Sequence, residues 1–372
     1  MGSAPQWHNG SQPPRRLNRH NKATRRGNDP QERNLMGGKL PRVLADARNA
    51  IRAMVETGST VLVACSGGAD SLALAASAAF LNRKGEIRAG AVVVDHRMQP
   101  GSAEVASAAA AQCRALGLSP VLVLEVDVAD SSEQAARIAR YGALKIALER
   151  TGATHILLGH TLDDQAEQVM LGLARGSGTL SLAGMPAVRG PFLRPLLGMD
   201  RSAMEQICAH EQLHYWEDPT NTDPTYLRND IRHRLMPVLR EVLGEQVSQA
   251  LARTAALARA DAAYLDEQAA LALLEATRLS TEHERRLDLS ALRALPGPLR
   301  SRVLRQGISG LGAPTPDFER LSALDHLVRD SKSAGPIQLD GQVLATRVAG
   351  PRLAAGESAF LRLCRPSAGS DI

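Results

Sequence analysis

Four short apolar runs alternate with segments long enough for helices, and this alternation constrains the fold more than any other feature of the chain. Helix-length segments such as residues 102–116 and 131–150 separate the runs, and the second opens with a capping-box pattern at Ser131. Strands that alternate with helices pair in parallel, and the helices cover the faces of the sheet. We therefore predict a doubly wound, mostly parallel α/β sheet of Rossmann-like type. Its predicted strands are residues 60–64, 89–94, 121–128 and 156–158.

The net charge of +5 is unevenly distributed along the 372 residues. Residues 1–42 contain nine Lys or Arg and two Asp or Glu, which leaves a net charge of −2 for residues 43–372. A polyanionic partner is compatible with this charge, provided that the folded part presents a local basic patch. The chain has no apolar signal core near its start and no uncharged apolar stretch of about 18 residues, so we expect a cytoplasmic protein.

Composition and periodicity divide the chain into four parts. We predict a disordered basic arm at residues 1–38, a catalytic ATP-binding domain at 39–220, a helical region that contacts RNA at 221–285, and a small α+β substrate-binding module at 286–372. In the last part, Asp340-Gly341 is typical of a hairpin turn. The four cysteines form no C-x-x-C pair and are interpreted as reduced thiols.

A glycine turn follows the first predicted strand and precedes an apolar helix. Glycine lacks a Cβ, so backbone can approach phosphate oxygens closely, and a helix N-terminus offers unpaired N–H groups to an anion. The turn lacks the lysine of a Walker-type site, which argues against kinase or motor chemistry. The structural alternative is an ordinary Gly-rich turn between a strand and a helix. The predicted phosphate-binding residues are Ser66, Gly67, Gly68, Ala69, Asp70 and Ser71, with Asp70 placed to hold Mg²⁺.

These residues resemble the S-G-G-x-D-S loop of the PP-loop ATP pyrophosphatases, which cleave ATP between its α- and β-phosphates. Seven further motifs, in order, are similar to those of the tRNA(Ile)-lysidine synthase family over residues 58–240, with a looser likeness to about residue 350. Residues before 40 have no recognisable counterpart there. The motifs are VDH at 94–96, ARIARY at 136–141, GHTLDDQAE at 159–167, RGSG at 175–178, RPLL at 194–197, EDPTN at 217–221 and RNDIR at 228–232.

The resemblance implies an ATP-dependent ligase that acts on a transfer RNA. ATP would adenylate the C2 carbonyl oxygen of cytidine 34, the wobble base of CAU-anticodon tRNA(Ile), and the ε-amine of free L-lysine would then displace AMP. The product, lysidine, pairs with A instead of G. The implied cofactors are ATP and Mg²⁺, no membrane is involved, and the oligomeric state is left open between monomer and homodimer.

Two carboxylates are candidates for the metal. Asp164 follows a strand end and faces the same sheet edge as Asp70, so the resemblance implies that the two share Mg²⁺ and act in catalysis. The alternative for Asp164 is an acid that only complements the helix dipole. Asp163 is the better candidate for a helix cap. Glu167, one turn on, supports either the metal or the amine, or is an exposed helical acid.

The other candidates are histidines and arginines. Asp95 and His96 at the end of the second predicted strand are assigned to ATP, and His160 is assigned to catalysis, with a packed histidine as its alternative. Arg137 and Arg140 share one helical face, so Arg137 is assigned to tRNA and Arg140 to catalysis, against the alternative of a solvated face.

A last group of candidates lies near residue 230. Arg228, Asn229 and Arg232 are assigned to tRNA because two guanidiniums on one stripe suit RNA phosphates. The alternative is salt bridges to Asp218 or Glu217.

Two other functions remain open. A PP-loop thiolase that adds sulfur to a tRNA base usually needs a cysteine pair, which the sequence lacks. A non-catalytic nucleotide-binding module with an RNA-binding arm would have no use for paired carboxylates beside the phosphate cradle.

Overall fold

The computed structural model describes residues 7–8, 41–97, 99, 101–127, 133–176, 178–223, 226–330, 335–354 and 356–365. The chain forms two compact units. The first comprises Met1–Leu171 and Met185–Arg253, and the second comprises Gly172–Gly184 and Thr254–Ile372. Among the described residues, no helix is long and apolar enough to cross a membrane.

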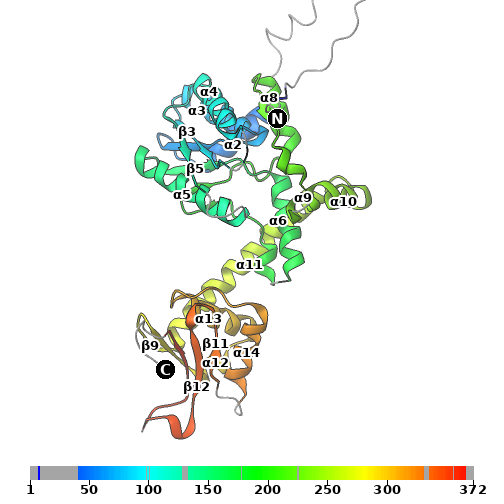
Figure 1. Ribbon diagram of the computed structural model, residues 1–372. Helices are drawn as coiled ribbons and strands as arrows, with labels where there is room; N and C mark the ends of the chain where they lie inside the picture. The colour runs from blue at the N-terminus through cyan, green and yellow to red at the C-terminus, as the bar shows by residue number, and fades with distance from the viewer. Residues whose placement is uncertain are drawn as a thin grey trace, which may run out of the picture. The chain divides into compact units, whose positions relative to one another are not determined.

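The first unit is built on a six-stranded sheet that is parallel except at one edge (Figure 1). Its strand order is β4-β3-β2-β5-β7-β6, and only the β6–β7 pair is antiparallel. This arrangement confirms the predicted doubly wound fold. The strands are β2 (Thr60–Ala64), β3 (Arg88–Asp95), β4 (Val121–Glu125), β5 (His155–Leu158), β6 (Val188–Arg189) and β7 (Phe192–Leu193).

Helices cover both faces of this sheet because its central strands are apolar on both sides. On one face, Val61 and Val63 of β2 pack under four helices. On the other, Leu62 packs with α5 (Glu133–Thr151), which lies opposite α3 and α4 in Figure 1. The four helices are α2 (Arg42–Arg52), α3 (Ala69–Arg83), α4 (Ser102–Ala115) and α8 (Arg201–His210).

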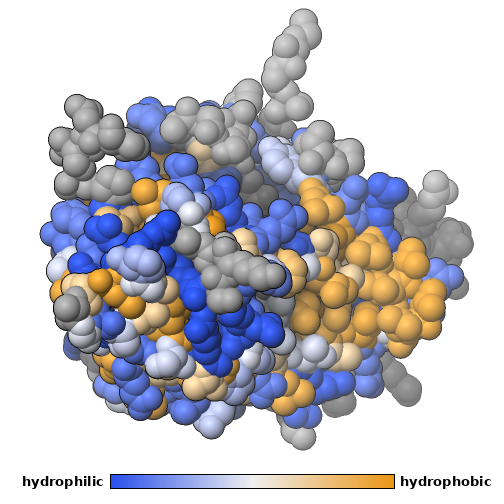
Figure 2. Space-filling view, turned by 90° about the horizontal axis from the view of Figure 1, so that it is seen from below, coloured by the Kyte–Doolittle hydropathy of each residue, from blue (hydrophilic) through white to orange (hydrophobic). Residues whose placement is uncertain are grey.

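A series of helices follows the sheet. Within the predicted helical region, the sequence pattern of residues 231–243 indicates a helix. The structure instead has α9 (Leu227–Asp230), a π-helical turn at Ile231–Leu235, and α10 (Met236–Leu243). Several apolar side chains of α10 are exposed, and Figure 2 shows apolar residues gathered on the side where α10 lies in Figure 1. The other elements are α6 (Leu162–Arg175), α7 (Thr179–Leu182), β8 (Tyr215–Trp216), a 3-10 turn at Pro219–Thr222 and α11 (Val247–Ala276).

The second unit packs α12, α13, α14 and the last turns of α11 against an antiparallel sheet in the order β11-β12-β13-β10-β9. The predicted hairpin is present, because β11 pairs with β12 across a turn in which Gly341 has a φ of 71°. The elements are β9 (Thr277–Ser280), β10 (Glu284–Asp288), α12 (Leu289–Ala294), α13 (Gly297–Ser309), α14 (Phe318–Arg329), β11 (Ile337–Gln338), β12 (Leu344–Val348), β13 (Phe360–Cys364), and two 3-10 turns at Asp340–Gln342 and Gly350–Arg352.

Two predictions fall largely outside the described residues. Of the arm at residues 1–38, only β1 (Trp7–His8) is described, and it pairs antiparallel with β8. The capping box expected at Ser131 also lies outside the described residues.

Candidate active site

The glycine turn between β2 and α3 is held by its own two serines. The Ser71 hydroxyl accepts a hydrogen bond from the Ser66 backbone N–H at 3.1 Å and donates to the Gly68 carbonyl at 2.9 Å. Gly67 has a φ of +86°, a conformation that favours glycine. A Cβ there would also lie 3.3 Å from the Cβ of Ala109 on α4. The turn therefore leads into the α3 N-terminus in the manner of an anion-binding loop.

Close backbone approach fixes the beginning of α3 against the neighbouring strand end. Gly159 follows β5, and a Cβ on it would lie 3.0 Å from the Asp70 carbonyl oxygen and 3.1 Å from the Ser71 Cα. On the other side, the Trp216 N–H donates to the Gly67 carbonyl at 2.9 Å. The glycine turn is thus held between the end of β5 and strand β8.

Asp70 lies in the first turn of α3 and is short of partners. Its Oδ1 atom is buried and accepts no hydrogen bond from the described residues. Burial, and after it the charge of Asp164, raise the pKa of Asp70 to about 7. A buried, unpaired carboxylate oxygen of this kind is suited to a cation.

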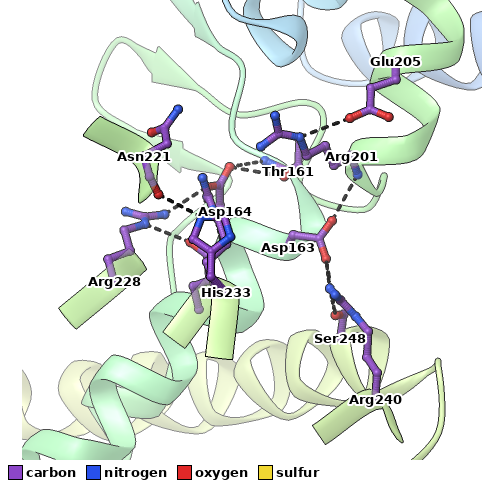
Figure 3. A network of polar contacts seen from close by, with 12 residues as sticks. Thr161, Asp163, Asp164, Arg201, Glu205, Asn221, Arg228, His233, Arg240 and Ser248 are labelled. Carbon is purple, nitrogen blue, oxygen red and sulfur yellow. Dashed lines mark hydrogen bonds and ion pairs between the residues drawn. The ribbon is translucent and has the colours of Figure 1, made fainter. Parts of the chain in front are cut away.

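Asp164 and Glu167 on α6 are bound by two arginines. Figure 3 shows one of them, Arg228, beside Asp164. Arg228 donates to Asp164 at 3.0 Å and to Glu167 at 2.9 Å. Arg232 donates to Asp164 at 2.9 Å and to Glu167 at 2.5 Å. Glu167, which the sequence left open as an exposed acid, is only 2% exposed. The acid pair and the arginine pair therefore neutralise each other inside the unit.

The electrostatics of this network favour the charged forms. Burial acts to raise the pKa of Asp164, but Arg228 and Arg232 outweigh it, so the pKa of Asp164 is lowered. Burial likewise acts to lower the pKa of Arg232, and the hydrogen bond and charge of Glu167 raise it instead. Asp70 and Asp164 thus have opposite shifts.

Thr161 fixes the orientation of Asp164, a role the sequence analysis missed. Its backbone N–H and its hydroxyl both donate to Asp164 Oδ2, at 2.9 and 3.2 Å, and Thr161 is 2% exposed. The signal was present in the sequence: T-L-D-D at 161–164 has the spacing of a capping box at the start of α6.

Asp163 points away from its neighbour and joins three helices (Figure 3). Its carboxylate accepts from the first N–H of α8, at Arg201, over 3.1 Å, and from Arg240 of α10 over 2.7 Å. Ser248 of α11 donates to it at 3.4 Å. The expectation that Asp163 caps its own helix is therefore wrong: the capping contact at the start of α6 is made by Asp164, and Asp163 instead accepts from the first N–H of α8.

The two candidate histidines have buried ring nitrogens without partners among the described residues, namely Nδ1 of His96 and Nδ1 of His160. Burial, followed by the nearby arginines, lowers the pKa of His160 to about 4, although Asp164 opposes the shift. Burial and then Arg140 lower the pKa of His96. Both rings are therefore neutral at neutral pH. Asp95 is buried at the end of β3, where it accepts from the Arg97 N–H at 2.9 Å.

The predicted arginine pair on α5 is held by an aromatic ring. The guanidiniums of Arg137 and Arg140 lie 5.1 and 5.7 Å from the ring centroid of Tyr141. The Tyr141 hydroxyl accepts from Arg194 at 3.1 Å. Both arginines are partly buried, so the alternative of a fully solvated helical face does not apply.

The residues assigned to tRNA near residue 230 have intramolecular partners. The salt-bridge alternative named Asp218 or Glu217, whereas the carboxylates bound by Arg228 and Arg232 are Asp164 and Glu167. The Asn229 amide donates to the carbonyls of Thr220 and Asp223 at 2.8 and 2.9 Å, so it orders the preceding loop.

Three of the four cysteines lie buried beneath the glycine turn. The Cys65 thiol is 3.7 Å from the Ser71 hydroxyl, and the Cys208 thiol donates to the Ala69 carbonyl at 3.4 Å. A hydrogen bond with Cys65, together with burial, raises the pKa of Cys113. The sequence shows no cysteine pair, but the fold brings Cys65 and Cys113 together in the core.

The chain was compared with known proteins. It matches the PP-loop domain family over residues 41–239 and the TilS substrate binding domain over residues 287–350. It is 46% identical to the tRNA(Ile)-lysidine synthase of Leifsonia xyli over 76% of this chain and 86% of that protein. Those of Thermobifida fusca and Streptomyces coelicolor are each 45% identical, over 82% and 79% of this chain and 95% and 84% of theirs.

The chain belongs to the tRNA(Ile)-lysidine synthase family. Membership confirms the resemblance found in the motifs, and it makes the chain an ATP-using ligase. A solved U34-tRNA thiolase, NcsA from Methanococcus maripaludis, is similar with a TM-score of 0.48 and 16% identity, over 57% of this chain and 77% of that chain.

Proposed function

We propose that this chain joins free L-lysine to C2 of cytidine 34 in the CAU anticodon of tRNA(Ile), with ATP cleaved to AMP and pyrophosphate. This is the ligation for which its relatives are named, and it changes decoding from AUG to AUA. The observation that supports it most is the meeting of the Asp70 loop with the Asp164–Glu167 pair at one sheet edge. The proposed site of ATP activation, at the Asp70 loop, then lies next to the proposed site of amine attack, at the Asp164–Glu167 pair.

The first step is adenylation. The C2 carbonyl oxygen of the cytosine attacks the α-phosphorus of ATP, and pyrophosphate leaves. Ser66, Gly67, Gly68, Ala69 and Ser71 are proposed to bind the ATP phosphates, because the turn leads into the N-terminus of α3, whose first N–H groups have no side-chain cap. Asp95 and His96, at the adjoining strand end, are proposed to complete the ATP site.

The second step is ligation. The lysine ε-amine, in its neutral form, attacks C2; AMP leaves, and the amine loses a proton. Arg140 is proposed to stabilise charge on the phosphate in both steps, since it lies within electrostatic reach of His96 and His160. The neutral His160 ring, whose buried Nδ1 has no partner among the described residues, is suited to contact the nucleotide, whereas a pKa of about 4 makes it a weak proton acceptor at neutral pH.

The residues present fit a Mg²⁺ ion best at Asp70. Its Oδ1 is buried without a partner, and Mg²⁺ usually binds one or two carboxylates together with substrate phosphates and water. When bound, Mg²⁺ supplies charge stabilisation for the pyrophosphate leaving group. Asp164 is the proposed second ligand, although its oxygens already accept hydrogen bonds from Thr161, Arg228 and Arg232. A direct role for Asp164 therefore requires at least one guanidinium to move.

The tRNA is proposed to contact Arg137, Arg228, Asn229 and Arg232. All four side chains are partly buried. Arginine contacts to RNA phosphates would contribute binding affinity and fix the position of the tRNA on the protein. We propose the cytoplasm as the place of action, where ATP, free lysine and tRNA occur together.

Label transfer tests the function. The full chain is incubated with ATP, Mg²⁺, radiolabelled lysine and a CAU-anticodon tRNA(Ile) transcript, with a transcript carrying U34 as the control. We expect label in the first RNA and none in the second. Pyrophosphate release without label from lysine, or label from a sulfide donor instead, would favour the thiolase, and no pyrophosphate release with any tRNA would favour a binding module.

A further inference from the structure

Arg194 is a buried guanidinium at the carboxyl edge of the sheet. It follows β7, whose Leu193 pairs with Leu157 of β5, so it lies beside the strand end that leads to His160. Arg194 is 2% exposed, and within the described parts of the chain no carboxylate forms an ion pair with it. Its Nε is buried without a hydrogen-bond partner. Because burying an unpaired charge is costly, a position that needed only apolar bulk would not hold arginine.

The two ends of the Arg194 fork have separate partners. Nη1 donates to the Pro186 carbonyl at 2.9 Å, and Nη2 donates to the Tyr141 hydroxyl at 3.1 Å. A lysine ammonium cannot reproduce this planar geometry. The Tyr141 ring also meets Phe192 edge-on, with centroids 4.9 Å apart and an interplanar angle of 79°. The ring is therefore fixed both at its hydroxyl and at its edge.

Tyr141 in turn supports Arg140, the next residue towards the start of α5. The Arg140 guanidinium lies 5.7 Å from the ring centroid, within the range of a cation–π contact. The charge of Arg140 also reaches His96 and His160, which follow two different strands, so this side chain is directed towards the strand ends. A rotation of the Tyr141 ring would change the surface on which Arg140 rests.

We propose that Arg194 and Tyr141 are positioning residues: Arg194 fixes the Tyr141 ring, and the ring holds the Arg140 guanidinium in place for the reaction. This inference rests on the catalytic role proposed for Arg140. It explains why the R-P-L-L segment at 194–197 contains a buried arginine that forms no ion pair with a described residue.

Tyr141→Phe tests the link most directly, because it removes one oxygen and leaves the ring with its packing. We expect the kcat of lysine ligation to fall on the order of tenfold, with the KM for ATP and the unfolding temperature little changed. Tyr264→Phe is the matched control, since Tyr264 on α11 is 62% exposed. Arg194→Lys should give the same loss as Tyr141→Phe, and the double variant should lose no more.

A double-mutant cycle with Arg140→Lys separates positioning from general structural support. If Tyr141 acts through Arg140, then Tyr141→Phe causes little further loss in the Arg140→Lys background. A full tenfold loss in that background, or wild-type kcat for Tyr141→Phe alone, overturns the proposal. The wild-type chain in the same assay reports on the proposed function by itself, so ligation by wild type with an unimpaired Tyr141→Phe rejects only the positioning role.

Discussion

Asp70 and Asp164 lie near each other, yet their surroundings shift the pKa values of the two carboxyl groups in opposite directions. Asp164 accepts from two guanidiniums and from Thr161, which keep it ionised. Asp70 has a buried oxygen without a partner and faces the charge of Asp164, so its pKa rises to about 7. Pairs of carboxylates whose pKa values are pushed apart often mark functional sites. Asp70 is therefore the carboxylate on which an incoming cation would have the larger effect.

Asp70→Asn should stabilise the metal-free protein at alkaline pH. The folded state retains the Asp70 proton until about pH 7, whereas the unfolded chain releases it near the ordinary aspartate pKa of 3.8. Between these values the unfolded state binds fewer protons, so the free energy of unfolding falls as pH rises. In denaturant titrations with a chelator, we expect Asp70→Asn to exceed wild type by a few kcal/mol at pH 8 and to match it at pH 4. Equal stability at both pH values would contradict the assigned pKa shift.

Asp70→Asn should also lower the rate of ATP–pyrophosphate exchange, on the order of a hundredfold.

Arg228→Ala separates a phosphate contact from a structural ion pair. If Arg228 binds a tRNA phosphate, the slope of log affinity against log salt should fall by about 1. If it serves only Asp164 and Glu167, stability falls and the slope is unchanged. Arg240→Ala is the matched control, because Arg240 pairs with the adjacent Asp163 at 2.7 Å and is not assigned to tRNA. A slope that changes equally in both variants would reject the assignment of Arg228.

At the scale of elements, periodicity predicted the strands well and the region after residue 226 less well. Residues 60–64 form β2 as predicted, whereas the expected helix over 231–243 is interrupted by a π-helical turn. Pro237, in the first turn of α10, has no N–H to donate to a carbonyl four residues earlier. π-Helical turns are rare, and they are frequently found at functional sites. The spacing of apolar residues cannot predict the ion pairs made in this region, because the carboxylates that Arg228 and Arg232 bind are more than 60 residues away in the sequence.

Gly159→Ala tests the contact between the end of β5 and the start of α3. The added Cβ would lie 3.0 to 3.1 Å from backbone atoms of Asp70 and Ser71, which cannot rotate away. Displacement of the first turn of α3 would move Asp70 relative to Asp164, so we expect ATP–pyrophosphate exchange to fall on the order of a hundredfold. Gly142→Ala on α5 is the control: nothing lies within 4 Å of its Cβ position, and alanine favours the helix by about 1 kcal/mol. Normal exchange by a folded Gly159→Ala variant would show that the loop tolerates the shift.

At the scale of the whole molecule, the fold class and the family followed from local patterns and motif order. The PP-loop and substrate-binding matches at 41–239 and 287–350 confirm both, while the four predicted domain boundaries remain predictions. The sequence could place Asp70, Asp95 and His160 at strand ends because parallel strands share one carboxyl edge. It could not give the partners of Asp163, Glu167 or Arg194, since these depend on tertiary contacts between distant segments.

The basic arm is predicted to act on tRNA by charge. Residues 1–38 contain seven Lys or Arg and two Asp or Glu, so their deletion removes a net charge of +5 and lowers the attraction for a polyanion. We expect tRNA binding to weaken at low salt, and the difference to vanish near 1 M salt, where the Debye length is about 3 Å. Turnover at saturating tRNA should be nearly unchanged.

A second variant distinguishes charge from the pairing of β1 with β8. It keeps Trp7 and His8 but replaces every Lys, Arg, Asp and Glu in residues 9–38 by Gln, so that it loses the same net charge as the deletion. Filter binding and single-turnover ligation are measured for both variants over a range of salt. The pairing brings Trp7 opposite Trp216, whose N–H donates to the PP-loop at Gly67, so the deletion alone removes this neighbour. If charge is the cause, both variants lose the same affinity at low salt and keep the same turnover. If only the deletion lowers turnover, then β1 supports the ATP loop through β8, and the prediction of a purely electrostatic arm is wrong.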